Sequence, residues 1–200
     1  PLDNDQTLVN GNIQVQASID SVVYTNLDTA YTINSADISS GIETISVDSS
    51  SLEGLTGFTE GEDIFFRAAI TDVAGNYTNG SASATTVTID QTAPTVTSIT
   101  STAADSTYGI WNEINVTVNF SEAVTLEDGT IVVTLETGDN DQSVSITSIT
   151  GSNSASGTYI VQAGDESSDL MATTVALSSG SILDAAGNTM SDFNIPSGAN

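Results

Sequence analysis

The chain has 200 residues, a formal net charge of −25, and no cysteine or histidine. Its 26 acidic side chains face one basic side chain, Arg67, so we expect no binding to nucleic acid. The missing cysteines exclude disulfides, and no apolar run is long enough for a membrane helix, so we expect no membrane insertion.

Period-two alternation of apolar residues predicts antiparallel strands along most of the chain. The clearest runs are "NIQVQASI", "DIFFRAAI", "EINVTVNF" and "TIVVTLE", at residues 12–19, 63–70, 113–120 and 130–136. Only "SSSLEGLTGF", at residues 49–58, suggests a single turn of helix. We therefore expect an all-β fold of two tandem Ig-like, Greek-key β-sandwich domains joined by a short linker.

A weak internal repeat supports two domains. The turn "TDVAGN" (Thr71 to Asn76) recurs as "LDAAGN" (Leu183 to Asn188), with a spacing of 112 residues that suits a sandwich-sized unit. Between the copies, "DQTAPTV" joins two strand-like runs. Pro94 favours extended geometry in the residue before it, so this link has little slack. We place the domains at residues 1–92 and 93–200.

These motifs resemble a known family. "DxAGN" followed by a strand and "DxTAPTV" is similar to the tandem Ig-like or cadherin-like repeats of large RTX-type bacterial surface adhesins. "ADSTYGIWNEINVTVNFSEAVTL" and "SGSILDAAGNTM" extend the resemblance over nearly all of residues 94–192. Residues 1–92 resemble a fibronectin-III or Ig-like neighbour more loosely. The resemblance implies sandwiches stiffened by Ca²⁺ at their junctions, and no catalysis. Trp111 replaces the usual Gly of the pattern, and "IPSGAN" ends the chain without a second "DxTAP".

Acidic residues without His or Cys favour Ca²⁺ over zinc or copper, because Ca²⁺ prefers hard oxygen ligands. Asp72 lies in the first "DxAGN" turn, and Asp90 lies at the exit of the first domain. Asp105 and Glu113 flank a loop that we expect to fold back towards the junction. We predict a shared Ca²⁺ site from these four carboxylates. The alternative is that Asp72 only caps its turn and Asp90 only ends a strand.

A second predicted cluster lies in the C-terminal domain. It consists of Glu122, Asp165, Asp169 and Asp184, which follow strands or lie in loops. If equivalent ends meet, these carboxylates gather at the far pole of the domain and bind Ca²⁺; the alternative is a solvated acidic loop. The acid-rich "GDNDQS", residues 138–143, lacks the central Gly and distal Glu of an EF-hand, so we interpret it as a hairpin loop.

The expected function is a structural extender segment of a large bacterial cell-surface adhesin, which supports adhesion or biofilm formation. Its expected partners are neighbouring repeats of the same chain and host or biofilm glycans or proteins, and we expect an extracellular monomer. A glycan- or protein-binding module is the alternative, and an ice or mineral binder is disfavoured because the Thr-x-Thr pieces are scattered. We expect no enzyme, because His, Cys and Lys are missing, although two-carboxylate glycoside hydrolysis stays formally open. Trp111 is expected to pack in the core or at the junction rather than to form a sugar platform with Tyr108 and Tyr159.

Overall fold

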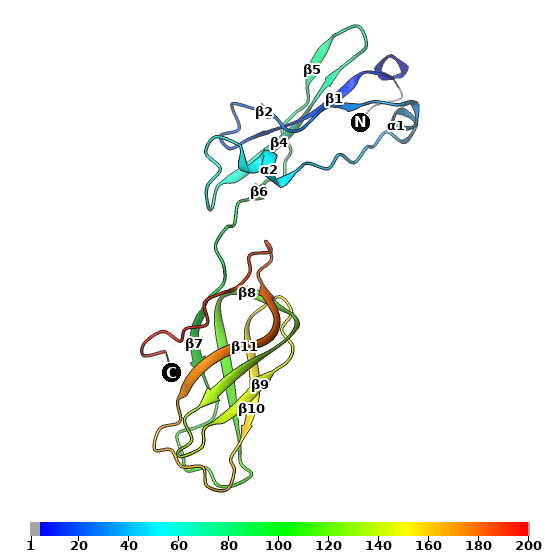
Figure 1. Cartoon of the computed structure of the whole chain (residues 1–200). Helices are drawn as coiled ribbons and strands as arrows, with labels where there is room; N and C mark the ends of the chain where they lie inside the picture. Colours follow the sequence, from blue (N-terminus) through cyan, green and yellow to red (C-terminus); the bar gives the residue numbers. More distant parts are fainter. Residues whose placement is uncertain (1–4, 200) are drawn as a thin grey trace. The chain divides into compact units, whose positions relative to one another are not determined.

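The computed structural model describes residues 5–199, and they divide into two compact units. Unit 1 ends at Asp90 and unit 2 begins at Gln91, so the division falls within "DQTAP". Both units consist mainly of antiparallel β-strands, as the composition predicts (Figure 1). Among the described residues, no helix has the length and apolar character that crossing a membrane requires.

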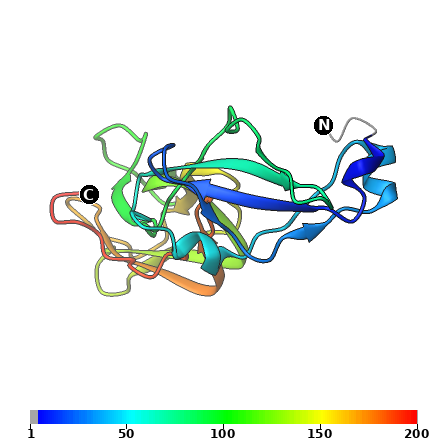
Figure 2. The ribbon, with the colours of Figure 1, turned by 90° about the horizontal axis from the view of Figure 1, so that it is seen from above.

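Unit 1 contains one antiparallel sheet of six strands and three short helical segments (Figure 1). Its strands β1 and β4 run side by side at the centre of the sheet (Figures 1 and 2). The elements are η1 (Gln6–Leu8), β1 (Asn12–Ser18), β2 (Thr25–Asn26), β3 (Tyr31–Thr32), α1 (Ser35–Ser40), α2 (Ser49–Glu53), β4 (Asp63–Thr71), β5 (Tyr77–Asn79) and β6 (Val87–Thr88).

One face of this sheet forms the core of unit 1. Ile13 pairs with Ile70, and Ala17 pairs with Phe66, so the apolar residues of β1 and β4 share a face. Two buried clusters form on this face, and the helices contribute Ile38 from α1 and Leu52 from α2. Both helices therefore cover the apolar face and leave the opposite face without a helix.

The six strands of unit 1 form one connected set, which β6 joins only through its pairing with β4. The predicted helical turn is present as α2, but α1 was not expected. Asn34 caps α1 by accepting from the backbone N–H of Ala36, and Asp37 accepts from the backbone N–H of Asn34, which completes a capping box.

Unit 2 is built around one long strand, β8 (Glu113–Leu135). The sequence predicts two strands here, at residues 113–120 and 130–136, but they are the two ends of this single strand. The first half of β8 pairs with β7 and β10, and the second half pairs with β9 and β11. These partners are β7 (Val96–Thr100), β9 (Gln142–Ile146), β10 (Ser152–Ile160) and β11 (Ala172–Leu183).

Both halves of β8 contribute to one core. Val118 and Val124 from the first half, with Ile131 and Val133 from the second, have 0% relative exposure. All four belong to a single buried cluster that also contains residues of the other strands. This single core, shared by all strands of unit 2, is compatible with the packing of a β-sandwich. A hairpin is present where it was predicted, but its loop is residues 136–141, because β8 ends at Leu135 and Gln142 and Ser143 already belong to its antiparallel partner β9.

Candidate metal centre

The two "DxAGN" motifs form the same kind of turn. In unit 2, Asp184 follows β11, and its Oδ1 accepts from the backbone N–H groups of Gly187 at 2.7 Å and Asn188 at 2.8 Å. Its Oδ2 accepts from the Asn188 side-chain amide at 2.8 Å. The backbone of Ala186 adds a further hydrogen bond to this carboxylate.

Asp184 is buried, with 7% relative exposure. Burial alone raises the pKa of its carboxyl, but the hydrogen bonds from Asn188, Gly187 and Ala186 outweigh burial and lower the pKa below its usual value. The side chain is therefore ionised at neutral pH. A buried negative charge is costly unless donors or cations compensate it, and part of that compensation comes from this turn.

Asp90, Glu122 and Asp184 form the candidate metal centre. Each offers one carboxylate oxygen, and these three oxygens lie within 4.8 Å of one another. Oxygens that share one Ca²⁺ lie about 2.3–2.6 Å from the ion, so two of them are at most about 5 Å apart. The three carboxylates therefore have a spacing that fits a common cation.

Three structural elements supply these carboxylates. Asp184 lies in the turn after β11, Glu122 lies within β8, and Asp90 ends unit 1 immediately before the linker. Asp90 and Glu122 are half-buried. The only basic side chain of the chain, Arg67, hydrogen-bonds to Gln16 in unit 1. Residues 91–200 contain no Lys, Arg or His.

Other predicted site residues of unit 2 lie at a different place. Asp105, Asp165 and Asp169 line a cleft of about 1060 Å³ formed by loops at one end of the sandwich. Asp169 precedes β11 and Asp184 follows it, so the strand separates them. The structure therefore brings Glu122 and Asp184 together but places Asp165 and Asp169 at the other end of unit 2.

The two remaining residues of the first predicted set have separate surroundings. Glu113 is exposed at the start of β8, near the end of β7 where Thr100 pairs with Thr117. Asp105 follows β7, whereas Pro94 precedes it. The loop that carries Asp105 and Glu113 consequently lies at the end of β7 away from Pro94, and does not fold back to the linker.

Asp165 is held by protein donors. It accepts from the Tyr159 hydroxyl at 2.5 Å, the backbone N–H of Gln162 at 2.7 Å and the Gln142 amide at 3.2 Å. The bond from Tyr159 is the main cause that lowers the pKa of the Asp165 carboxyl. Burial and the same bond raise the pKa of Tyr159. These hydrogen bonds therefore attach the loop that carries Asp165 to the core.

Asp72 occupies the first "DxAGN" turn in unit 1. Its carboxylate accepts from the backbone N–H of Asn76 at 2.8 Å and from the Asn76 side-chain amide at 2.7 Å. These bonds lower the pKa of the Asp72 carboxyl. Within residues 5–199, the only group of at least three acidic residues close enough to share a metal ion is Asp90, Glu122 and Asp184, so Asp72 belongs to none.

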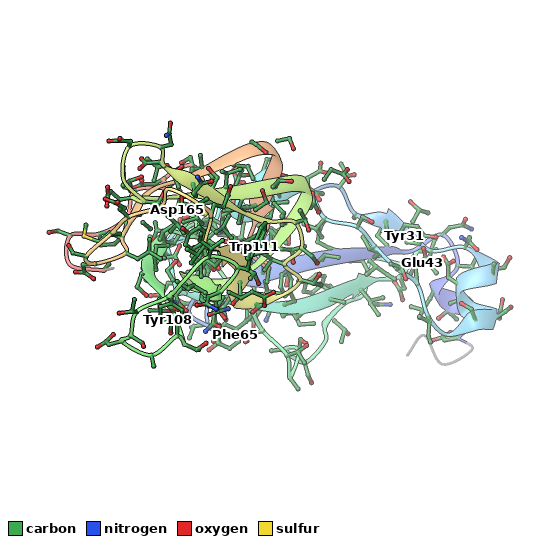
Figure 3. All side chains as sticks on the ribbon, turned by 90° about the horizontal axis from the view of Figure 1, so that it is seen from below. Tyr31, Glu43, Phe65, Tyr108, Trp111 and Asp165 are labelled. Carbon is green, nitrogen blue, oxygen red and sulfur yellow. The ribbon has the colours of Figure 1, made fainter. Side chains whose placement is uncertain are left out.

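Trp111 is expected to pack in the core or at the junction, but it lies outside the core, with 80% relative exposure. Figure 3 shows it with Tyr108 and Asp165 at the end of unit 2 nearest to the viewer. The backbone N–H of Asn112 donates to the carbonyl of Gly109, and Trp111 has a φ of 72°. This is the third position of a tight turn, where a positive φ favours glycine. The backbone thus explains why the resembled pattern usually has Gly here.

No protein-family model matches the chain, and no curated protein matches it.

Sequence reasoning named all three residues of the candidate metal centre but divided them between two sets. Asp90 was assigned to the linker set, and Glu122 and Asp184 to the other. The "DxAGN" repeat was the signal for Asp184, and "FSE" at the end of an alternating run was the signal for Glu122. Glu122 and Asp184 lie close together because β8 and β11 pair antiparallel. Composition does not reveal this pairing.

Proposed function

We propose that the chain is a Ca²⁺-stiffened structural extender, a segment of a large bacterial cell-surface adhesin. The observation that carries the proposal is the convergence of Asp90, Glu122 and Asp184 on one small volume. The antiparallel β-sheet structure and the strongly acidic composition agree with this proposal. In this proposal, neighbouring repeats of the same chain are the principal partners, and the segment acts as a spacer without catalysis.

Calcium would act here through charge and geometry. Two unit negative charges about 4.8 Å apart repel each other by about 3 kcal/mol at an effective dielectric constant of about 20. A divalent cation replaces that repulsion with attraction to each carboxylate. Because Asp90 immediately precedes the linker, coordination would also restrict the linker, in which Pro94 already limits backbone freedom.

The direct test is calcium titration of the full chain by isothermal calorimetry. We expect one dominant site, and we expect Glu122→Gln to weaken its affinity by at least about tenfold, because a neutral amide oxygen replaces a charged ligand. Glu127→Gln is the matched control: Glu127 lies in the same strand, outside the candidate centre, and its substitution should leave the affinity unchanged.

Small-angle scattering tests the extender role. With Ca²⁺, the wild-type chain should show a narrower distribution of interatomic distances than with EDTA, because a restricted linker samples fewer arrangements. Glu122→Gln should remove this difference and Glu127→Gln should keep it. Binding of Ca²⁺ without any change in scattering would retain the metal site but refute the stiffening role. A wild-type chain that binds no Ca²⁺ would refute both.

A further inference from the structure

The outer face of the unit 1 sheet carries amide and aromatic side chains. Gln16 pairs with Arg67 on β4 and with Asn26 on β2, so their side chains point away from the apolar face. By the same alternation, Tyr77 and Asn79 of β5 lie on this side. We call this surface the amide face and define it by Gln14, Gln16, Tyr24, Asn26, Arg67, Tyr77 and Asn79.

Hydrogen bonds hold the amide face in a fixed arrangement. Gln16 is its centre, with 6% relative exposure. Its Nε2 donates to Asn26 Oδ1 at 2.7 Å and to the Tyr77 hydroxyl at 3.4 Å, while its Oε1 accepts from Arg67 Nε at 2.7 Å. The Tyr77 hydroxyl donates to Asn79 Oδ1 at 2.7 Å. Side chains that are positioned beforehand lose less entropy when a ligand binds.

Arg67 gives this face the only positive side-chain charge in the chain. Its guanidinium carbon lies 3.9 Å from the centroid of the Tyr24 ring, so a cation–π contact orients it. Its single hydrogen bond within residues 5–199 uses Nε, and no acidic side chain of this part pairs with it. The two terminal nitrogens therefore present a planar fork of donors, which complements a carboxylate.

The types and numbers of polar side chains on the amide face indicate the class of ligand that it binds. One guanidinium stands among four side-chain amides, which both donate and accept hydrogen bonds as sugar hydroxyls do. Tyr77, with 55% relative exposure, offers an amphipathic ring that can lie against a sugar ring. A polyanion needs several cations and is repelled by the net charge of −25. An acidic peptide likewise needs more than one cation.

From this match we propose that the amide face binds an acidic sugar, a pyranose that carries a single carboxylate. The carboxylate pairs with the terminal nitrogens of Arg67. The hydroxyls pair with Asn26, Asn79 and neighbouring amides, and the sugar ring lies against Tyr77. This site uses none of the residues of the candidate metal centre, so it stands or falls separately from the proposed calcium role.

The test is a nuclear magnetic resonance titration of the ¹⁵N-labelled full chain in EDTA, with glucuronate and glucose as probes. The two sugars differ only by a carboxylate in place of a hydroxymethyl group. We expect glucuronate to shift the backbone signals of Gln16 and Arg67 and the Arg67 Nε–H signal. Glucose should bind at least about tenfold more weakly, because it lacks the charge-assisted hydrogen bonds.

Variants assign the contacts. Arg67→Gln should lower glucuronate affinity to that of glucose, and Arg67→Lys should recover only part of the difference, because an ammonium lacks the planar fork. Tyr77→Ala should weaken both sugars by a similar factor. Trp111→Ala, in unit 2, is the control and should change neither affinity. The spectrum of each variant shows whether unit 1 is folded, and Arg67→Lys serves if Arg67→Gln unfolds it.

Three results would overturn the proposal. The first is that glucuronate shifts no signal of the amide face in the wild-type chain at millimolar concentration. The second is that glucose binds as tightly as glucuronate, or that folded Arg67→Lys leaves the preference intact. The third is that a short Asp- and Glu-containing peptide binds the same face at least as tightly as glucuronate.

Discussion

The two "DxAGN" turns have matching local structure and different surroundings. Asp72 and Asp184 each accept from the backbone N–H and the side-chain amide of the Asn four residues later. Gly75 and Gly187 have φ values of 87° and 96°. Only Asp184 is buried, and only Asp184 lies beside two further carboxylates among the described residues.

The two turns show that the motif determines the local turn structure, whereas neighbouring residues determine whether a metal centre forms. Asp, Gly and Asn at these spacings form an Asx-type turn wherever a strand ends, because the carboxylate satisfies nearby backbone amides. A metal centre requires other carboxylates, and those come from distant parts of the chain. The motif alone therefore predicts a turn, and the candidate metal centre depends on tertiary structure.

The largest expected difference between the turns is in stability. Asp184→Ala should lower the free energy of unfolding of unit 2 by about 2–4 kcal/mol, because buried amides lose a charged acceptor. Asp72→Ala should have a smaller effect on unit 1, because that turn is open to water. Hydrogen–deuterium exchange of the full chain, read in β11 and β4 peptides, measures both. Equal losses in the two units would contradict the assigned role of burial.

Calcium should increase the difference in stability that depends on the two turns. At a free Ca²⁺ concentration about 100 times Kd, binding stabilises the native state by about 2.7 kcal/mol. We expect this gain in exchange protection and melting temperature for unit 2, and we expect Asp184→Asn to remove it. Asp72→Asn is the matched control, since it makes the same change in the equivalent turn, and it should preserve the gain. Loss of the gain in both variants would mean that the ion is bound elsewhere.

The pH dependence should be similar in the two units. The pKa values of Asp72 and Asp184 are both lowered in the folded chain, so each carboxylate stabilises its unit above its unfolded pKa of about 3.9. That contribution should disappear as the pH falls through the folded pKa. Acid titration followed by circular dichroism measures the loss, and Asp184→Asn and Asp72→Asn should each reduce it. Equal loss of stability on acidification in the wild-type chain and in both variants would contradict these pKa directions.

The smallest expected effect concerns the glycines. A Cβ added at Gly75 or Gly187 meets no atom within 4 Å, so only backbone strain opposes it. Gly75→Ala and Gly187→Ala should therefore each cost about 1–2 kcal/mol, the penalty of a left-handed conformation. Exchange protection in the corresponding unit measures each cost. A much larger cost at Gly187 would mean that the two turns already differ locally.

Local patterns were sufficient to predict the central strands β1, β4 and β8 but not their connections. Ile13, Val15 and Ala17 alternate with polar residues, and this pattern alone places them on one face of β1. The sequence around Glu122, by contrast, does not indicate that the alternating runs at residues 113–120 and 130–136 form one strand. The continuation depends on pairing with β10 on one side and β11 on the other, which are distant in the sequence.

The candidate metal centre was predictable residue by residue but not as a group. Asp169 lies in a predicted loop and Asp184 in a predicted turn, and both are expected at one pole of the domain if equivalent strand ends meet. A strand of twelve residues instead separates them, by roughly 40 Å at about 3.3 Å per residue. Glu122 and Asp184 come together because β8 pairs antiparallel with β11, which places Thr125 opposite Leu183, and that information is not local.

The shared strand β8 also limits which insertions and deletions unit 2 can accept during evolution. Its pairing with β10 reaches Val124, and its pairing with β11 begins at Thr125. Its fully buried apolar side chains end at Val124 on one side and resume at Ile131 on the other. Side chains on a strand alternate with a period of two, so one residue gained or lost between these positions would turn one half inside out. Insertions should accumulate in the loops that end the strands, while the length of β8 should stay constant across descendants of this sequence.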